Sequence, residues 1–264
     1  MFPKTIHQIW LGKKPFPAIA EAWTASYRRH MPDWEIKRWG DADLPELAGR
    51  LSCPHLVLDE TAGMGIRCDV LRYEIVRLFG GIYMDHEMEI FRPLDEIVIE
   101  DCLHFALSFN QLDAVSNAFF GSPPGHPFWD LLLKDLGETV PARRPENPWD
   151  VLELTGYRAV RKALHRLLGG KVEGLALEAE DGWTAGWLFD QADLVGWSRE
   201  AVHPYHLHEM RHDRFRLEDF PRAFAAHHWQ GEWVGEGSGP ALAQAGMMLP
   251  TAGMGPWGST VSRA

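Results

Sequence analysis

The chain has 264 residues, and 45% of them are hydrophobic. This length allows one large α/β domain or two small ones with a sizeable core, and the composition argues against global disorder. The formal net charge of −11, from 26 Lys+Arg against 37 Asp+Glu, argues against a nucleic-acid binder, which is usually basic. An acidic chain can still bind a phosphate ligand through local cations or a metal.

Cysteine usage and apolar runs bear on the compartment. The three cysteines, Cys53, Cys68 and Cys102, are odd in number and widely spaced, so we expect neither a disulfide framework nor a cysteine zinc site. Residues 1–5 lack the apolar run of a signal peptide, and no window approaches the roughly twenty apolar residues of a membrane span. We therefore expect a cytoplasmic protein without a transmembrane segment.

Hydrophobic patterning near the start of the chain predicts alternating strands and helices. The expected elements are a strand at 5–11, a helix at 15–30, a strand at 34–39 and a short helix at 43–51. The clearest helix is 66–79, where Leu71, Ile75 and Leu78 share one face. The pair Gly80-Gly81 is a stop signal for that helix.

The later elements continue the alternation. Expected strands are 82–84, 88–91, 103–109 and 116–121, and expected helices are 127–136 and 149–168. Strands that alternate with helices indicate an α/β sheet, here with a helical insertion around 127–168. We expect one domain, 1–235, followed by a flexible tail, 236–264, in a region rich in Gly, Ala, Met and Ser.

Two carboxylates, Asp85 and Glu87, close the short apolar strand that follows the glycine pair. Side chains at i and i+2 of a strand share one face, so both acids should point the same way. Two like charges at the end of a buried strand are costly unless a cation lies between them. A hard divalent cation, Mn²⁺ or Mg²⁺, prefers such oxygen ligands. The alternative is a simple polar strand end.

Asp69 and Arg72 lie three residues apart on the clearest helix, away from its apolar face. Taken alone they indicate a solvated ion pair worth tenths of a kcal/mol. The helix leads through the glycine turn into the Asp85 strand, however, and this arrangement can place all four charged residues around one cleft. There an arginine can bind phosphate or sugar oxygens, and a carboxylate can accept bonds from sugar hydroxyls.

The whole run from Ile66 to Glu87, IRCDVLRYEIVRLFGGIYMDHE, resembles the DXD region of a glycosyltransferase family. That family includes fungal initiating mannosyltransferases and bacterial capsular sugar transferases, and its pattern is similar to that of the clostridial glucosylating toxins. Further blocks agree in the expected order. They are 3–12 (PKTIHQIWLG), 117–127 with Gly125-His126-Pro127, Thr155-Gly156, and 227–233 (HHWQGEW). The sequence departs from the family at Glu87, Tyr157 and Glu232, which stand where Asp, Pro and Ser are usual.

The resemblance implies a GT-A fold, a nucleotide-sugar donor such as a UDP-hexose or GDP-mannose, and retention of configuration at the anomeric carbon. It implies that Trp10 contacts the base, that Asp69 and Arg72 hold the sugar and its phosphate side, and that Asn117 lies beside the sugar. Asp85 would contact the ribose and the metal. Further implied roles are Glu87 as metal ligand, His228 or Glu232 as completing the metal shell, and Trp233 as donor to the departing phosphate.

These roles predict a metal-dependent hexosyltransferase with Asp85, Glu87 and Arg72 as catalytic residues and a saccharide or glycolipid acceptor. Because Glu87 and Glu232 depart from the pattern, a degenerate domain that binds a sugar nucleotide without transfer stays open as an alternative. A zinc hydrolase built on His206 and His208 is a weaker alternative, since no second ligand pattern accompanies them. Trp10 also has a plainer interpretation, as a core aromatic.

Overall fold

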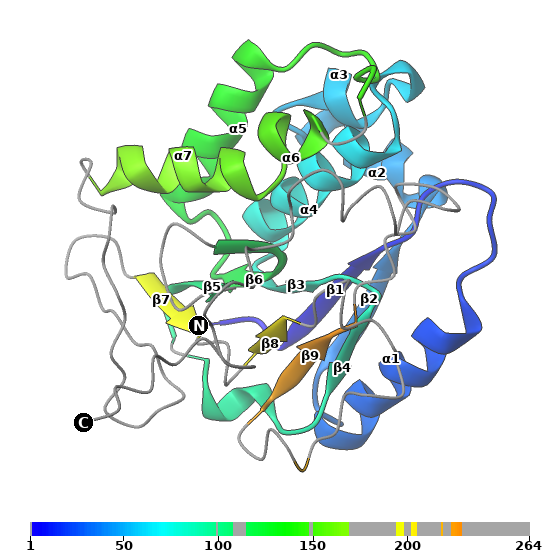
Figure 1. Cartoon of the computed structure of the whole chain (residues 1–264), viewed down its shortest axis with the longest axis vertical. Helices are drawn as coiled ribbons and strands as arrows, with labels where there is room; N and C mark the ends of the chain where they lie inside the picture. Colours follow the sequence, from blue (N-terminus) through cyan, green and yellow to red (C-terminus); the bar gives the residue numbers. More distant parts are fainter. Residues whose placement is uncertain are drawn as a thin grey trace, which may run out of the picture.

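In this computed structural model the described residues are 2–98, 100–107, 115–147, 150–168, 194–197, 202–204, 218 and 223–228. They form a central mixed sheet, a set of helices and a second, smaller sheet (Figure 1).

In the described part of the chain the central sheet has six strands, in the order β2-β1-β3-β6-β5-β7. Their bounds are Thr5–Ile9 for β1, Glu35–Trp39 for β2, Gly81–Met84 for β3, Leu103–Leu107 for β5, Val115–Ser122 for β6 and Leu194–Trp197 for β7. β1 pairs in parallel with both β2 and β3, whereas β6 is antiparallel to β3 and to β5. The parallel β1–β3 pair requires a crossover, which the intervening helices provide.

Seven α-helices are described. Their bounds are Ala18–His30 for α1, Leu44–Leu47 for α2, Pro54–Val57 for α3, Met64–Phe79 for α4, Pro127–Thr139 for α5, Asp150–Leu154 for α6 and Tyr157–Leu167 for α7. Single 3₁₀ turns lie at Asp41–Asp43, Ala48–Arg50, Glu60–Ala62 and Leu94–Glu96. None of the helices in this part of the chain combines the length and the apolar character that crossing a membrane requires.

The second sheet has three described strands in the order β4-β9-β8, with bounds Met88–Ile90, Ala225–His227 and Val202–Pro204. β9 is antiparallel to β4, and His227 lies opposite Met88. Only three residues separate the end of β3 from the start of β4, so this connecting turn, 85–87, lies where the two sheets meet.

The central sheet is buried on both faces. Tyr83 packs into the core under α4 and α5, while its neighbours Ile82 and Met84 pack with Tyr27 of α1 and Met88 of β4. This alternation is the two-residue period of a strand. In Figure 1 the helices α4–α7 accordingly lie above the sheet, and α1 and the small sheet lie below it.

The glycine pair fixes the connection from α4 to β3. Gly80 and Gly81 have φ angles of +65° and +84°, which side-chain-bearing residues rarely adopt. A Cβ on Gly81 would lie 2.5 Å from the carbonyl oxygen of Thr5. The chain therefore turns sharply here and brings Asp85 back beside α4.

Most of the expected elements are confirmed to within a few residues. The expected helix 149–168 is wrong in one respect, because it divides into α6 and α7 at Thr155-Gly156. The short strands β7, β8 and β9 were not predicted. The proposed tail, 236–264, lies outside the described residues.

Candidate functional site

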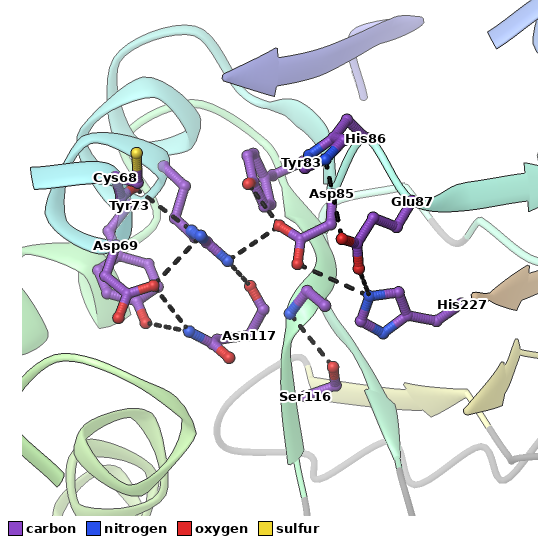
Figure 2. A network of polar contacts seen from close by, with 12 residues as sticks. Cys68, Asp69, Tyr73, Tyr83, Asp85, His86, Glu87, Ser116, Asn117 and His227 are labelled. Carbon is purple, nitrogen blue, oxygen red and sulfur yellow. Dashed lines mark hydrogen bonds and ion pairs between the residues drawn. The ribbon is translucent and has the colours of Figure 1, made fainter. Parts of the chain in front are cut away.

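The guanidinium of Arg72 contacts three of the other expected site residues, Asp69, Asp85 and Asn117. Figure 2 shows these three residues in one network that also holds Tyr83, Glu87 and His227. Nη1 of Arg72 lies 3.1 Å from Oδ1 of Asp85, and its Nη2 lies 3.2 Å from Oδ1 of Asp69. Nη1 also donates to the carbonyl oxygen of Asn117 at 2.8 Å. The guanidinium carbon lies 4.6 Å from the ring centroid of Tyr83. One cation thus joins α4, the end of β3 and the start of β6.

Asp69 is buried, and both of its carboxylate oxygens have partners. Oδ1 accepts from Nδ2 of Asn117 at 3.1 Å, and Oδ2 accepts from the hydroxyl of Thr155 at 2.9 Å. Burial raises the pKa of Asp69 to about 6, although Arg72 and these two hydrogen bonds oppose the rise. The interpretation of Asp69 and Arg72 as a solvated pair is wrong, since their side chains are only 8% and 11% exposed.

Asp85 presents its two oxygens to different surroundings. Oδ1 accepts from the hydroxyl of Tyr83 at 2.6 Å and faces Arg72. Oδ2 lies 3.8 Å from Nε2 of His227. The backbone N–H of Asp85 donates to the carbonyl of Ala118 at 2.8 Å, which holds the residue against β6.

Glu87 approaches the same histidine. Its Oε2 lies 3.6 Å from Nε2 of His227, and its side chain is only 6% exposed. Asp85 and Glu87 were expected to share the face of one strand, but β3 ends at Met84 and both acids lie in the turn that follows. Figure 2 shows their carboxylates directed toward the ring of His227, so they converge through the turn and not through the pleat.

His227, and not His228, faces the two acids. Nε2 of His228 lies 2.9 Å from Oε2 of Glu89, and its ring stacks on Trp23 with centroids 4.6 Å apart and an interplanar angle of 4°. The sequence analysis identified the block 227–233, which contains both histidines, but assigned the metal shell to His228. A strand assignment for Ala225–His227 would have separated them, because consecutive side chains of a strand point to opposite faces.

Trp10 lies beside the turn that carries the two acids. Its ring packs edge-on against His86, with centroids 4.9 Å apart, and against Phe16, at 5.5 Å. Its indole N–H donates to the carbonyl of Lys14 at 2.7 Å. Trp10 is therefore only partly buried and flanks the site. Glu232 and Trp233 lie outside the described residues, as do His206 and His208.

The donor set around the turn suits a hard cation in part. Two carboxylates and one imidazole are the ligand types that Mn²⁺ accepts. Even so, no group of three or more His, Cys, Asp or Glu side chains in the described part of the chain has the geometry of a metal site. Among the described residues, the ligands on offer for such an ion are therefore Asp85, Glu87 and His227.

Comparisons with known proteins bear on this site. No protein-family model matches the chain. Inositol phosphoceramide mannosyltransferase 3 of Schizosaccharomyces pombe is 29% identical over 140 residues, which are 51% of this chain and 37% of that protein. Uncharacterized glycosyltransferase L373 of Acanthamoeba polyphaga mimivirus is 25% identical over 140 residues, which are 52% of this chain and 56% of that protein. The chain thus spans less than two thirds of these relatives.

Among solved structures, one described as PaToxG Glycosyltransferase matches with a TM-score of 0.53 at 17% identity. The match covers 64% of this chain and 71% of that chain. A likeness at this identity concerns the fold alone, and the expected GT-A fold is confirmed by it. The sequence relatives confirm the expected resemblance to glycosyltransferases as a distant one.

Proposed function

We propose that this chain, a distant relative of the fungal mannosyltransferases with a GT-A fold, is a metal-dependent retaining glycosyltransferase. It would move a hexose from a nucleotide sugar, a UDP-hexose or GDP-mannose, to a saccharide or glycolipid acceptor. A cytoplasmic location remains part of the proposal. The observation that supports it most is the convergence of Asp85 and Glu87 beside the buried guanidinium of Arg72.

Each residue of the site has a part in this proposal. Trp10, which packs beside His86 of the turn, would contact the base. Asp69 and Asn117 receive the sugar hydroxyls, and Arg72 faces its phosphate side. Asp85 and Glu87 would hold Mn²⁺ or Mg²⁺, with His227 beside them. A bound cation would supply neutralisation of the charge that develops on the departing diphosphate.

The proposed role of His228 changes with the structure, whereas those of Glu232 and Trp233 still rest on the resemblance. His228 contacts Glu89, so we propose that it supports β4 and does not ligate the metal. Glu232 as a ligand and Trp233 as a hydrogen-bond donor to the departing phosphate remain proposals from the resemblance.

The transfer we propose breaks the bond between the anomeric carbon and the phosphate oxygen, and the electron pair stays with the phosphate. The acceptor hydroxyl oxygen bonds the anomeric carbon from the same face, and its proton passes to the departing phosphate oxygen. Arg72 is preorganised for the developing negative charge, because Asp69, Asp85 and the Asn117 carbonyl fix its guanidinium before any donor binds. Burial strengthens this interaction, since water does not screen it.

A second candidate function is binding of a sugar nucleotide without transfer. The two departures from the family pattern, Glu87 in place of Asp and Glu232 in place of Ser, favour it. Both candidate functions include binding of the sugar-nucleotide donor, but only the transferase turns the donor over.

The test is donor turnover by purified protein with UDP-glucose and GDP-mannose, in Mn²⁺ and in EDTA. We expect release of UDP or GDP in Mn²⁺ only, and Asp85→Ala should lower it at least a hundredfold, as removal of a preorganised charge does. Asp135→Asn, on α5 and paired with Arg166, is the control and should behave as the wild type. Turnover by Asp85→Ala at the wild-type rate would refute the assignment.

Two further readouts separate the alternatives. Binding of a donor without release of nucleotide under any condition supports the non-transferring domain. Where product forms, proton NMR of its anomeric signal decides the stereochemistry, and an inverted product would contradict the same-face transfer.

A further inference from the structure

The break between α6 and α7 places one buried hydroxyl on the site. α6 ends at Leu154, and Thr155 is fully buried. Its backbone N–H donates to the carbonyl of Val151 at 2.9 Å, and its own carbonyl accepts from the hydroxyl of Tyr73 at 2.7 Å. The backbone of Thr155 is thus tied to α6 through its N–H and to α4 through its carbonyl.

The hydroxyl of Thr155 has two acceptors within reach and one proton to give. Oδ2 of Asp69 lies 2.9 Å away, and the carbonyl oxygen of Val151 lies 3.3 Å away. The shorter contact is to the carboxylate, and hydrogen bonds to charged acceptors are the stronger ones. Oδ2 is also the oxygen of Asp69 that neither Arg72 nor Asn117 contacts.

We propose that Thr155 is a positioning residue for Asp69, and through it for the sugar moiety of the donor. The inference rests on the proposed function, in which Asp69 receives sugar hydroxyls. Arg72 and Asn117 hold Oδ1, and Thr155 holds Oδ2, so the plane of the carboxylate is fixed only when all three contacts are present.

Loss of the Thr155 hydroxyl has a specific consequence. The carboxylate of Asp69 would turn about its bond to Cβ and would no longer present a fixed pair of oxygens. A hydrogen bond to a charged group is strong enough for its loss to change affinity about tenfold or more. In the proposed function the base binds at Trp10 and the diphosphate at the turn 85–87 and Arg72. Asp85 and the Asn117 carbonyl hold Arg72 without Asp69, so binding of the nucleotide does not require the Thr155 hydroxyl.

The experiment compares Thr155→Val, which removes the hydroxyl, with Thr155→Ser, which keeps it. Calorimetry in Mn²⁺ measures the affinities for UDP-glucose and GDP-mannose and, separately, for UDP and GDP. We expect Thr155→Val to weaken binding of the preferred nucleotide sugar about tenfold or more and to leave the matching nucleotide unchanged. Thr155→Ser should bind both as the wild type does.

Thr24→Val is the matched control. Thr24 is also fully buried, and its hydroxyl donates to the Ala20 carbonyl at 2.9 Å within α1, away from Asp69. It should leave the ratio of the two affinities unchanged. Circular dichroism checks each variant for folding, and Thr155→Ala replaces the valine variant if that one does not fold.

The outcomes are separable. If the wild type binds neither nucleotide sugar nor nucleotide, the proposed function fails and the inference fails with it. If the wild type binds the nucleotide sugar and Thr155→Val binds it equally well, or loses the sugar nucleotide and the free nucleotide in equal measure, the positioning role is overturned while the proposed function stands.

Discussion

At the scale of single residues, the site is defined by how its charges are satisfied. Arg72 and Asp69 are buried, and burial of a charge is costly unless partners surround it. Arg72 meets this condition with two carboxylates, two carbonyls and one aromatic face. A lysine has one compact charge in place of a planar fork and would not meet all of them together. The network is therefore built for arginine specifically.

The raised pKa of Asp69 predicts a dependence on pH. Burial raises this pKa from its ordinary value of 3.8 to about 6, so donor binding that needs the carboxylate should weaken below pH 6. The folded protein binds the proton more tightly than the unfolded chain. Asp69 therefore contributes stability that is complete below the unfolded pKa and is lost as pH rises through about 6. Its full size is on the order of 2–3 kcal/mol.

Urea unfolding of the wild type and Asp69→Asn between pH 4 and 7.5 measures the pH-dependent stability that Asp69 contributes. The wild type should lose stability relative to the variant as pH rises, because the variant cannot titrate there. The groups that face Asp69 are Arg72, Tyr73, Asp85, Asn117 and Thr155, and Arg72 and Tyr73 keep their protonation state over this range. A stability difference that does not change with pH would contradict the assignment of this pKa.

At the scale of elements, the turn between α4 and β3 determines where Asp85 lies. Gly81→Ala should destabilise the protein by roughly 3 kcal/mol, because its φ of +84° strains a side-chain-bearing residue and the added Cβ would approach the Thr5 carbonyl to 2.5 Å. Thermal and urea unfolding measure this loss. Gly49→Ala is the control, since a Cβ there would meet nothing within 4 Å. Equal stability of the two variants would show that the turn tolerates a side chain.

Short stretches of sequence were enough to predict the helix α4 and the turn that leads from it toward Asp85 and Glu87. Apolar periodicity predicted α4, and the glycine pair predicted its end, because both depend on neighbours in the chain. The division of 149–168 at Thr155 was not predictable in this way. It depends on contacts with Asp69 and Tyr73, which lie more than 80 residues earlier in the chain. Three-residue strands such as β9 likewise owe their existence to distant partners.

At the scale of the whole molecule, the candidate site gathers segments from both sheets. Trp10 follows β1, Arg72 lies on α4, Asp85 follows β3 and His227 ends β9. The sequence could name the residues of the compact α4–β3 block together. It could not decide between His227 and His228, because that choice requires the strand register of a segment some 140 residues further along. The pairing of β9 with β4 in the small sheet supplies that register.

Because the site joins segments that are distant in the chain, donor binding should stabilise the molecule as a whole. A ligand at a hundred times its Kd adds about 2.7 kcal/mol to the stability of the folded state. We expect UDP-glucose or GDP-mannose to raise the Tm in Mn²⁺ and not in EDTA.

Glu87→Gln should abolish the part of this rise that needs Mn²⁺, since the amide keeps the size of the side chain and removes its charge. Its Tm without ligand should stay near that of the wild type, because the acid is one of a converging pair of like charges and its neutralisation relieves their repulsion. Glu46→Gln, on the exposed side of α2, is the control. A Mn²⁺-dependent rise that persists at full size in Glu87→Gln would show that the cation is held elsewhere, and it would remove the chemical role proposed for the turn between the two sheets.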